Sequence, residues 1–362
     1  MSQLCRSGTC PFVRTDTPII VGDRDRLRTR DRLTIRRVLH SLLRIEAKTS
    51  FVSRQELRRL LPISNGALSP PGVGVLRCHS QVPMPTILAC VNLKGGVGKT
   101  AIAVNFAAYC GRQGMRTLLV DCDPQTNATF SCISAEEWVE HAKQHGTIAS
   151  LLGVRAIAGA TNLNDAKTVI KYGVFENVDL VPSHISLFSV DLALGGAAGR
   201  ELKLRKALKP VLDQYDMVVC DCPPNLTIPT QNALAMSTHY VMPVPPDYLS
   251  ILGVAFLNTQ VEDLCENLDH EITNAGIIVS RVGRKANHRE NLLASLRMKF
   301  EGLVLQSELR ERVAVPESVS LQKSIFEMGD EQASQEFTAM SEELLGRIRG
   351  TSDKVRALGA SA

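Results

Sequence analysis

The chain has 362 residues, a formal net charge of +4 and hydrophobic residues at 44% of its positions, enough to bury a sizeable core in one large domain or two ordinary ones. Its apolar runs fall far short of the ~20 residues that a membrane-spanning helix needs, and its first thirty residues carry scattered Arg and Asp where a signal peptide would be apolar. We therefore expect a cytoplasmic protein.

Cysteine usage agrees with that expectation. Cys90, Cys110, Cys122, Cys220 and Cys222 lie in or beside apolar segments rather than in a disulfide framework of loops, and the sequence has no Cys-x-x-Cys pair. Cys220 and Cys222 occupy alternate positions of an apolar run, so their side chains are expected on one face. Packing in the core is favoured there over metal binding.

Residues 1–83 form a basic segment with little apolar periodicity. They contain fourteen Arg and one Lys against six acidic residues, a net charge of +9, which leaves −5 for the rest of the chain. Pro70, Pro71 and the glycines that follow indicate a linker. We expect a poorly ordered basic extension; the alternative is a small helical DNA-reading module, whose second helix the prolines would shorten. Met84 directly precedes the first clear strand and is a possible start of the folded protein.

From residue 86 onward, apolar segments typical of buried strands alternate with segments typical of helices. The expected strands are 86–93, 116–121, 178–183, 215–222, 239–244 and 274–280, and the expected helices are 99–113, 200–212 and 249–264. This alternation predicts an α/β fold with a mostly parallel sheet and helices on both faces. In such sheets, ligands bind at the carboxyl ends of the strands.

The first expected strand leads directly into a glycine-rich segment, "KGGVGKT", at residues 94–100. Gly95, Gly96 and Gly98 allow the backbone to curl with its amides inward, a geometry that side chains would obstruct. Inward amides offer several hydrogen bonds to phosphate oxygens. The segment therefore predicts an anion-binding loop.

The residues around those glycines specify a nucleotide. Lys99 is expected to neutralise the β and γ phosphates, and Thr100 to place its hydroxyl on Mg²⁺, at the positive end of the following helix. The usual pattern asks for glycine at the position of Leu93, which this chain lacks. It has instead a second lysine, Lys94, beside the phosphate site.

The segment "KGGVGKT" resembles the deviant P-loop of the ParA/MinD class of ATPases, and the chain is most similar to the ParA/Soj-type partition ATPases. Three further segments match in the same order: "LLVDCDPQTNAT", "MVVCDCPPNLTIPTQNAL" and "VMPVPPDYLSILGV". The resemblance covers residues 84 to about 345. It implies a P-loop NTPase domain, bounded here at 84–349, followed by a C-terminal tail at 350–362.

The resemblance implies separate roles for the two lysines. Lys99 would bind the phosphates of its own chain's ATP, whereas Lys94 would reach across an ATP-bound homodimer to the partner's phosphates. Asp123 would orient the attacking water, so these three are the implied catalytic residues. The implied nucleotide-binding residues are Lys94, Gly95, Gly96, Val97, Gly98, Lys99, Thr100 and Ala101. Ala101 stands where the family often has a second Thr.

The implied magnesium site consists of Thr100, Asp121 and Asp221. Asp221 matches the Walker B aspartate, which holds Mg²⁺ through water, and Asp121 would support the metal and the phosphate loop. Pro223 and Pro224 would begin a nucleotide-sensing switch.

A pair of histidines suggests zinc only weakly. His141 and His145 have the i, i+4 spacing that suits Zn²⁺, but Ala142 occupies the place where a zinc protease needs Glu. A solvated helix face is favoured. The single tryptophan, Trp138, is expected to serve packing.

Two basic clusters are candidates for DNA binding. The first contains Arg281, Arg284, Lys285 and Arg289, and the second contains Arg310 and Arg312. A run of charge is usually a solvated face. The resemblance nevertheless implies a DNA site, because ParA-type proteins carry arginines in the first region that hold DNA without reading its sequence.

The function implied is a slow, partner-stimulated, Mg²⁺-dependent ATPase that forms an ATP-sandwich dimer on nonspecific DNA. It would act in plasmid or chromosome partitioning with a ParB-like partner, in the cytoplasm and on the nucleoid. The C-terminal "RIRGTSDKVRALGASA", interrupted by Gly350, does not resemble the membrane-binding helix of MinD-like proteins, so we expect no membrane partner. Two alternatives stay open: a related ATPase that positions another cargo, and a nucleotide-switched scaffold with negligible turnover.

Overall fold

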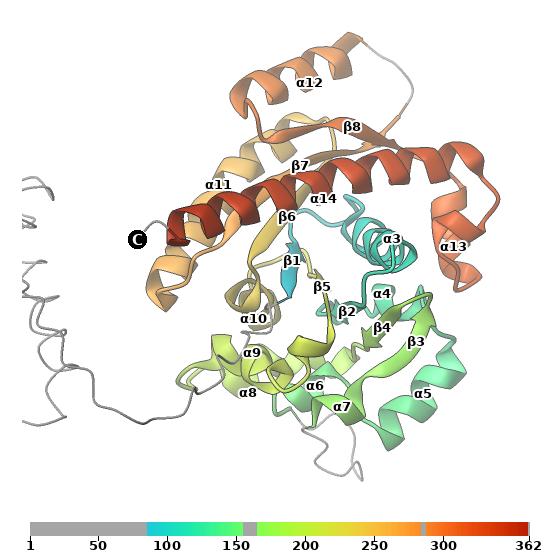
Figure 1. The fold of residues 1–362 in the computed structure, drawn as a ribbon, viewed down its shortest axis with the longest axis vertical. Helices are drawn as coiled ribbons and strands as arrows, with labels where there is room; N and C mark the ends of the chain where they lie inside the picture. Colours follow the sequence, from blue (N-terminus) through green and yellow to red (C-terminus); the bar gives the residue numbers. More distant parts are fainter. Residues whose placement is uncertain (1–84, 155–164, 284–286, 361–362) are drawn as a thin grey trace, which may run out of the picture. The chain divides into compact units, whose positions relative to one another are not determined.

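A single mixed sheet of eight strands organises the part of the chain that the computed structural model describes, residues 85–154, 165–283 and 287–360 (Figure 1). In spatial order the strands are β3 (Lys171–Phe175), β4 (Val178–Val181), β2 (Thr117–Asp121), β5 (Met217–Asp221), β1 (Thr86–Cys90), β6 (His239–Val244), β7 (Thr273–Val282) and β8 (Val304–Arg310). All neighbours are parallel except β3 and β4. The expected α/β class is confirmed.

Helices cover both faces of this sheet. The helices are α3 (Lys99–Arg112), α4 (Asn127–Phe130), α5 (Ala135–Gln144), α6 (Ile148–Leu151), α7 (Ala166–Val169), α8 (Val190–Leu194), α9 (Lys203–Leu208), α10 (Ile228–Met236), α11 (Tyr248–Leu268), α12 (Asn287–Lys299), α13 (Ala314–Ser320) and α14 (Glu331–Ala360), with short 3₁₀ turns at Ile185–Ser189, Arg200–Leu202, Leu212–Gln214 and Ile325–Glu327. α3 and α14 lie on one face, and α10 and α11 on the other. No helix in the described ranges is both long and apolar enough to cross a membrane.

The two faces have separate cores, as the alternation of side chains along β1 shows. Ile87 and Ala89 pack into one cluster, and Leu88 and Cys90 into the other. A strand that is buried on both faces needs apolar residues at nearly every position, which explains the continuous apolar runs. These strands hold the site's loops on a rigid base.

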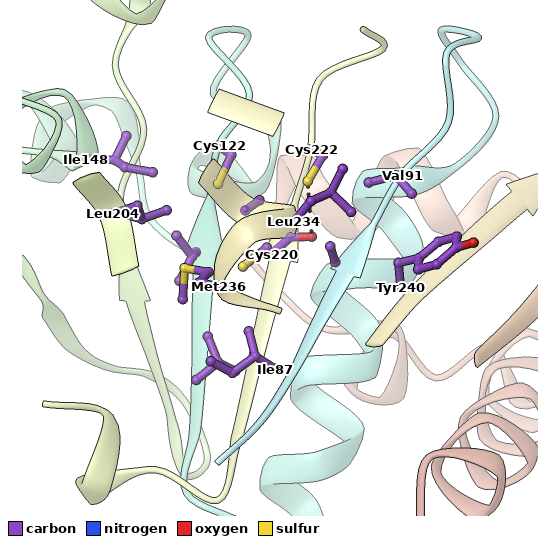
Figure 2. Packing of buried hydrophobic residues seen from close by; sticks show 14 of the residues in the cluster. Ile87, Val91, Cys122, Ile148, Leu204, Cys220, Cys222, Leu234, Met236 and Tyr240 are labelled. Atoms are coloured by element: carbon purple, nitrogen blue, oxygen red, sulfur yellow. Dashed lines mark hydrogen bonds between the residues drawn. The ribbon is translucent and has the colours of Figure 1, made fainter. Parts of the chain in front are cut away.

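The cysteines confirm the core prediction. Cys220 and Cys222 are fully buried in one core cluster together with Cys122 (Figure 2). Every cysteine that the structure describes is buried and outside any disulfide. Burial is the first cause of the raised pKa of the Cys90 thiol, so that thiol stays protonated and inert.

Two sequence expectations need correction. The expected helix at 200–212 is broken into a 3₁₀ turn, the short α9 and a second 3₁₀ turn. Gly350 does not interrupt the last helix, because α14 continues through it to Ala360; one exposed glycine costs a helix only ~1 kcal/mol. The proposed boundary at 349/350 therefore falls inside a helix. The predictions for residues 1–83 and for Met84 lie outside the described residues.

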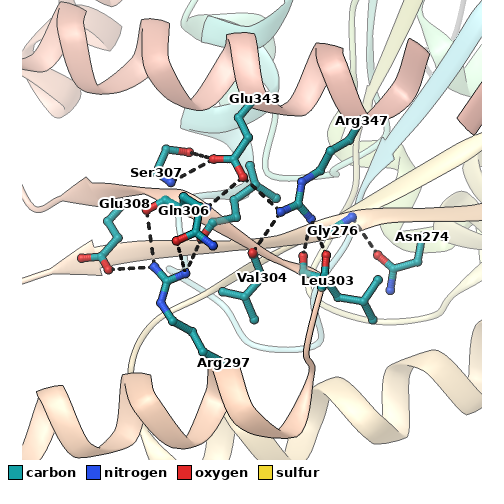
Figure 3. A network of polar contacts seen from close by, with 12 residues as sticks. Asn274, Gly276, Arg297, Leu303, Val304, Gln306, Ser307, Glu308, Glu343 and Arg347 are labelled. Atoms are coloured by element: carbon teal, nitrogen blue, oxygen red, sulfur yellow. Dashed lines mark hydrogen bonds and ion pairs between the residues drawn. The ribbon is translucent and has the colours of Figure 1, made fainter. Parts of the chain in front are cut away.

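The outermost strand next to β7 is β8, and side chains from neighbouring helices bind its backbone (Figure 3). The pairing register with β7 shifts within β8, and Glu343 of α14 accepts the N–H groups of Gln306 and Ser307 at 2.8 and 2.9 Å. Arg347 donates to the carbonyl oxygens of residues 302–304. Arg297 of α12 donates to those of residues 305 and 306. The irregular part of the edge is thus fixed by three side chains.

Candidate nucleotide-binding site

A cavity of about 830 Å³ opens where β1, β2, β5 and β7 end. Its walls include the loop between β1 and α3, Asp123 after β2, Pro224 after β5 and Ser280 near the end of β7. The sheet therefore brings together segments far apart in the sequence, at the edge where a parallel sheet binds ligands.

The phosphate loop has the backbone that its glycines permit. Gly96 has φ 71° and Gly98 has φ 91°, left-handed values that other residues adopt only with strain. The carbonyl of Val97 accepts the Ser280 hydroxyl at 2.7 Å, and that of Gly96 accepts Nη1 of Arg281 at 2.6 Å. β7 thus holds the outer side of the loop.

The amide groups of the same loop are available to a ligand. Across the described residues, no group accepts a hydrogen bond from the backbone amides of residues 95–98. Since the carbonyls at 96 and 97 are tied to β7, the loop offers donors and no competing acceptors at those positions. This arrangement fits the oxygens of a phosphate group.

The two lysines occupy different surroundings. Lys99 is buried, and its Nζ donates to the carbonyl of Lys94 at 3.1 Å. Nζ of Lys94 lies 2.8 Å from Oδ2 of Asp247, the N-cap residue of α11. Lys99 thus lies inside the loop, whereas Lys94 lies on its rim.

Asp121 and Asp123 lie two residues apart but have different surroundings. Both oxygens of Asp121 are engaged, Oδ1 by the N–H of Asp123 and Oδ2 by the N–H and hydroxyl of Thr129. Burial raises the pKa of Asp121 to about 7. Asp123 lines the cavity, and its Oδ1 accepts the N–H of Gln125 at 2.9 Å. Asp121 therefore shapes the loop that presents Asp123.

Asp221 has the features of a cation ligand. It is fully buried, and neither carboxylate oxygen has a hydrogen-bond partner of normal geometry within the described residues. Burial is the main cause of its strongly raised pKa, and Asp121 raises the pKa further, while the nearby Thr100 hydroxyl partly opposes the shift. An unpartnered buried carboxylate is costly, and a magnesium ion beside Thr100 would relieve that cost. The residues present therefore fit Mg²⁺.

Three of the six predicted DNA-binding residues lie near acidic side chains of the same chain. Arg281 has a left-handed backbone, φ 52°, and its guanidinium pairs with Glu311 as well as Gly96. Arg312 forms two bonds with Glu336, at 2.7 and 3.1 Å. The Arg310 side chain is mostly exposed, 3.8 Å from the same carboxylate. Arg284 and Lys285 lie outside the described residues, as does the side chain of Arg289.

Part of the cavity lining carries no pattern that the sequence reveals. This part is largely apolar: Leu309, Val313, Val315, Pro316, Val319 and Phe337. Gln125 and Asn127, inside a matched motif but without an assigned role, also line it. The missed residues lie on β8, α13 and α14, where no local pattern distinguishes a cavity wall from ordinary core.

The solvated face predicted for the two histidines is wrong for His141. This residue is buried, and its Nε2 lies 2.9 Å from the carbonyl of Val169, so it donates there. Burial lowers the pKa of His141. The described residues contain no metal-binding group of three or more His, Cys, Asp or Glu side chains. Trp138 packs against Phe130 and stacks on His184, as the packing prediction required.

Comparisons with known proteins match one family model and several relatives. The family described as AAA domain matches residues 85–274. The chromosome-partitioning ATPase Soj of Thermus thermophilus is 32% identical over 266 residues, 72% of this chain and 96% of Soj. Cell division protein PomZ of Myxococcus xanthus is 31% identical over 259 residues, 71% of this chain and 77% of PomZ.

A solved structure supports the same fold. It is cobyrinic acid a,c-diamide synthase from Mycobacterium smegmatis with bound ADP and magnesium, which superposes with a TM-score of 0.59 at 24% identity, over 72% of this chain and 94% of that one. The stretch of this chain matched by the family contains the phosphate loop, Asp121, Asp123 and Asp221.

Proposed function

The chain belongs to the ParA/MinD-type P-loop ATPases, the family of Soj and PomZ, and from this we propose that it is a slow, Mg²⁺-dependent ATPase that alternates between a monomer and an ATP-bound homodimer. The observation that carries the proposal is Asp221, a buried carboxylate neither of whose oxygens has a partner of normal geometry among the described residues. It lies beside a loop whose amides are available at residues 95–98. That combination suits a magnesium nucleotide better than a bare anion or a bare cation.

Each residue of the site has one task in this proposal. The loop amides and Lys99 hold the phosphates, and Thr100 and Asp221 hold Mg²⁺, with Asp121 supporting the loop behind them. The metal, when bound, neutralises charge on the phosphates during transfer. Asp123 orients the attacking water, since it lines the cavity and burial raises its pKa despite the opposing effect of Lys99. A carboxylate with a raised pKa can accept a proton more readily at neutral pH.

Exposed apolar side chains at the carboxyl ends of the strands support a homodimer. Tyr248 and Leu249 begin α11 directly after Asp247, and Ile185 and Phe188 follow β4; all four are exposed. Both pairs follow the carboxyl end of a strand, the side of the sheet on which the cavity opens, and exposed apolar groups near a site are candidates for an association surface. A second copy that covers them would bring its own Lys94 toward this chain's nucleotide.

We propose that the dimer binds DNA without sequence preference and acts in partitioning with a ParB-like partner, on the nucleoid of the cytoplasm. Soj, named as a chromosome-partitioning ATPase, supports this assignment. The basic residues are Arg284 and Lys285 together with Arg281, Arg289, Arg310 and Arg312. Because phosphate contacts add up and weaken with salt, pairing two chains would raise DNA affinity sharply.

A second candidate is an ATPase of the same type that positions another cargo. PomZ, named as a cell division protein, favours it. Both candidates require ATP-dependent dimers, so the cargo and the partner distinguish them. A scaffold without turnover is the third possibility, and a measured rate of ATP hydrolysis decides it.

The test is titration of a fluorescent random duplex at two salt concentrations, with and without ATP. We expect binding only with ATP, and its loss when Arg284→Glu and Lys285→Glu are combined while the dimer persists. The N-terminal segment, with its +9 charge, can bind DNA by itself. The titration therefore uses both the full chain and a chain that starts at Met84. If the shorter chain ignores DNA in every condition, the cargo-positioning candidate replaces the DNA-binding one.

A further inference from the structure

Lys94 is bound within its own chain, at the loop that follows β6. Its Nζ lies 2.8 Å from Oδ2 of Asp247 and 3.4 Å from Oγ of Ser250. Its backbone N–H donates to Asn92, whose side-chain amide donates to the carbonyl of Pro243. The first residue of the phosphate loop is therefore tied to the end of β6 through both its backbone and its side chain.

Asp247 does not need Lys94 to satisfy its carboxylate. Oδ1 accepts the N–H of Ser250 at 2.9 Å as the cap of α11, and Oδ2 also accepts the Ser250 hydroxyl at 2.8 Å. Burial alone would raise the pKa of Asp247, but the bonds from Lys94 and Ser250 outweigh it and hold the pKa below its usual range. If Lys94 leaves, the carboxylate keeps its cap at a partly exposed position.

The side chain of Lys99 binds the backbone of Lys94 from inside the phosphate loop. Its Nζ donates to the carbonyl of Lys94 at 3.1 Å. A phosphate held by Lys99 would compete for that ammonium group and loosen its bond to the Lys94 carbonyl. Nucleotide binding and the release of the Lys94 side chain therefore involve neighbouring atoms of one loop.

We propose that Asp247 is a positioning residue that latches Lys94 in the resting chain, and that Lys94 must leave Asp247 before it can reach ATP on a second copy. This inference rests on the proposed role of Lys94 in the homodimer. The two side chains are 48% and 38% exposed, and ion pairs at such positions shift equilibria only about two- to fivefold. A contact of this strength can open in every cycle.

The substitution that tests the latch is Asp247→Asn in the full chain. Asparagine caps a helix as well as aspartate does, so α11 is preserved while the charge that holds Lys94 is removed. The first measurement is the rate at which acetic anhydride modifies Lys94 without ATP, read by peptide mass spectrometry. We expect roughly two- to fivefold faster modification in Asp247→Asn, in proportion to the ion pair that is lost.

The second measurement is the dissociation constant of the ATP-bound dimer, by analytical ultracentrifugation. We expect a dimer roughly two- to fivefold tighter for Asp247→Asn, and no effect of Asp247→Asn when Lys94→Ala is already present. The matched control is Asp216→Asn, which removes an ion pair of the same 2.8 Å length with Arg116. That pair directly precedes β2 and β5, at the amino ends of the strands, whereas the cavity lies at their carboxyl ends. The dimer should therefore be unchanged.

Unchanged modification of Lys94, or a dimer no tighter than wild type, overturns the latch while leaving the proposed function intact. The proposed function fails on a different result. If the wild-type chain stays monomeric with ATP, or if Lys94→Ala dimerises and turns over ATP normally, Lys94 has no role on a second copy, and the latch falls with that role.

Discussion

Asp121 and Asp221 lie directly opposite each other in the register of β2 and β5, and both are fully buried. Their partners differ completely. Asp121 accepts three hydrogen bonds from Asp123 and Thr129, whereas neither oxygen of Asp221 has a hydrogen-bond partner of normal geometry among the described residues. Two adjacent carboxylates thus have separate functions: one organises a loop, and the other is available to a cation.

The first prediction concerns Asp221. Asp221→Asn should raise the free energy of unfolding of the ligand-free chain by about 1–3 kcal/mol, because the amide carries no buried charge. It should also abolish the extra stabilisation that Mg²⁺ adds to ATP. Urea unfolding with ATP, in magnesium and in EDTA, measures both effects. The exposed Asp213→Asn should change neither, and a destabilised Asp221→Asn chain without ligand would contradict the cation site.

Lys99→Ala should strongly weaken ATP binding. A charge-assisted hydrogen bond to phosphate is worth about 1.5–3 kcal/mol, so the affinity should fall at least tenfold. Equilibrium binding of a fluorescent ATP analogue measures the loss, and the exposed Lys323→Ala is the control for charge. Wild-type affinity in Lys99→Ala would refute the assignment of the phosphate loop.

Asp123→Ala should separate binding from hydrolysis. ATP binding and the dimer should persist, because Asp123 is assigned to the water and not to the phosphates, while the rate should fall about 10²- to 10⁴-fold. Light scattering with ATP and a phosphate-release assay measure the two properties. Asp263→Ala, on the exposed side of α11, should leave both unchanged. An Asp123→Ala chain that is monomeric with ATP would assign the residue to assembly.

The environment of His141 predicts a pH effect on stability. Burial lowers its folded pKa below the ordinary 6.5, so the unfolded chain binds the proton more readily and this contribution to stability is lost as the pH falls below ~6.5. His141→Gln lacks that proton. Between pH 7.5 and 5.5 its unfolding free energy should therefore fall less than that of wild type. Identical pH profiles in urea unfolding would rule out a neutral, buried His141.

A chain that starts at Met84 should fold and hydrolyse ATP like the full protein. All the residues that line the described cavity lie beyond it. Circular dichroism and the rate of phosphate release check this expectation, with the full chain as reference. An insoluble or inactive shorter chain would place residues 1–83 within the fold.

The sequence predicted the strands that carry the site because both of their faces are buried. The observed bounds of β6 equal those predicted. The loops after β1, β2 and β5 were predicted to form one site because their glycines, lysine and aspartates suit a single ligand, a magnesium nucleotide. Those residue types at those spacings have a local physical cause, so a single sequence reveals them.

The rest depended on tertiary contacts that have no local pattern. The apolar lining of the cavity includes side chains such as Leu309 and Phe337, which in the sequence look like any core residue. Arg281 reads as part of a basic run, but its left-handed backbone and its bond to Gly96 place it beside the phosphate loop. Likewise, the buried ring of His141 bonds the carbonyl of Val169, 28 residues further along the chain, a partner that no local pattern reveals.

Edge strand β8 limits how copies of this chain can assemble. A sheet grows sideways only when its outermost strand presents free backbone donors and acceptors to an incoming strand. Here Glu343 already binds two amides of β8, while Arg347 and Arg297 bind the carbonyls beside them. At this irregular stretch, an incoming strand would compete for backbone donors and acceptors with a carboxylate and two guanidinium groups. This stretch of β8 is therefore poorly suited to pairing with a strand of a second copy.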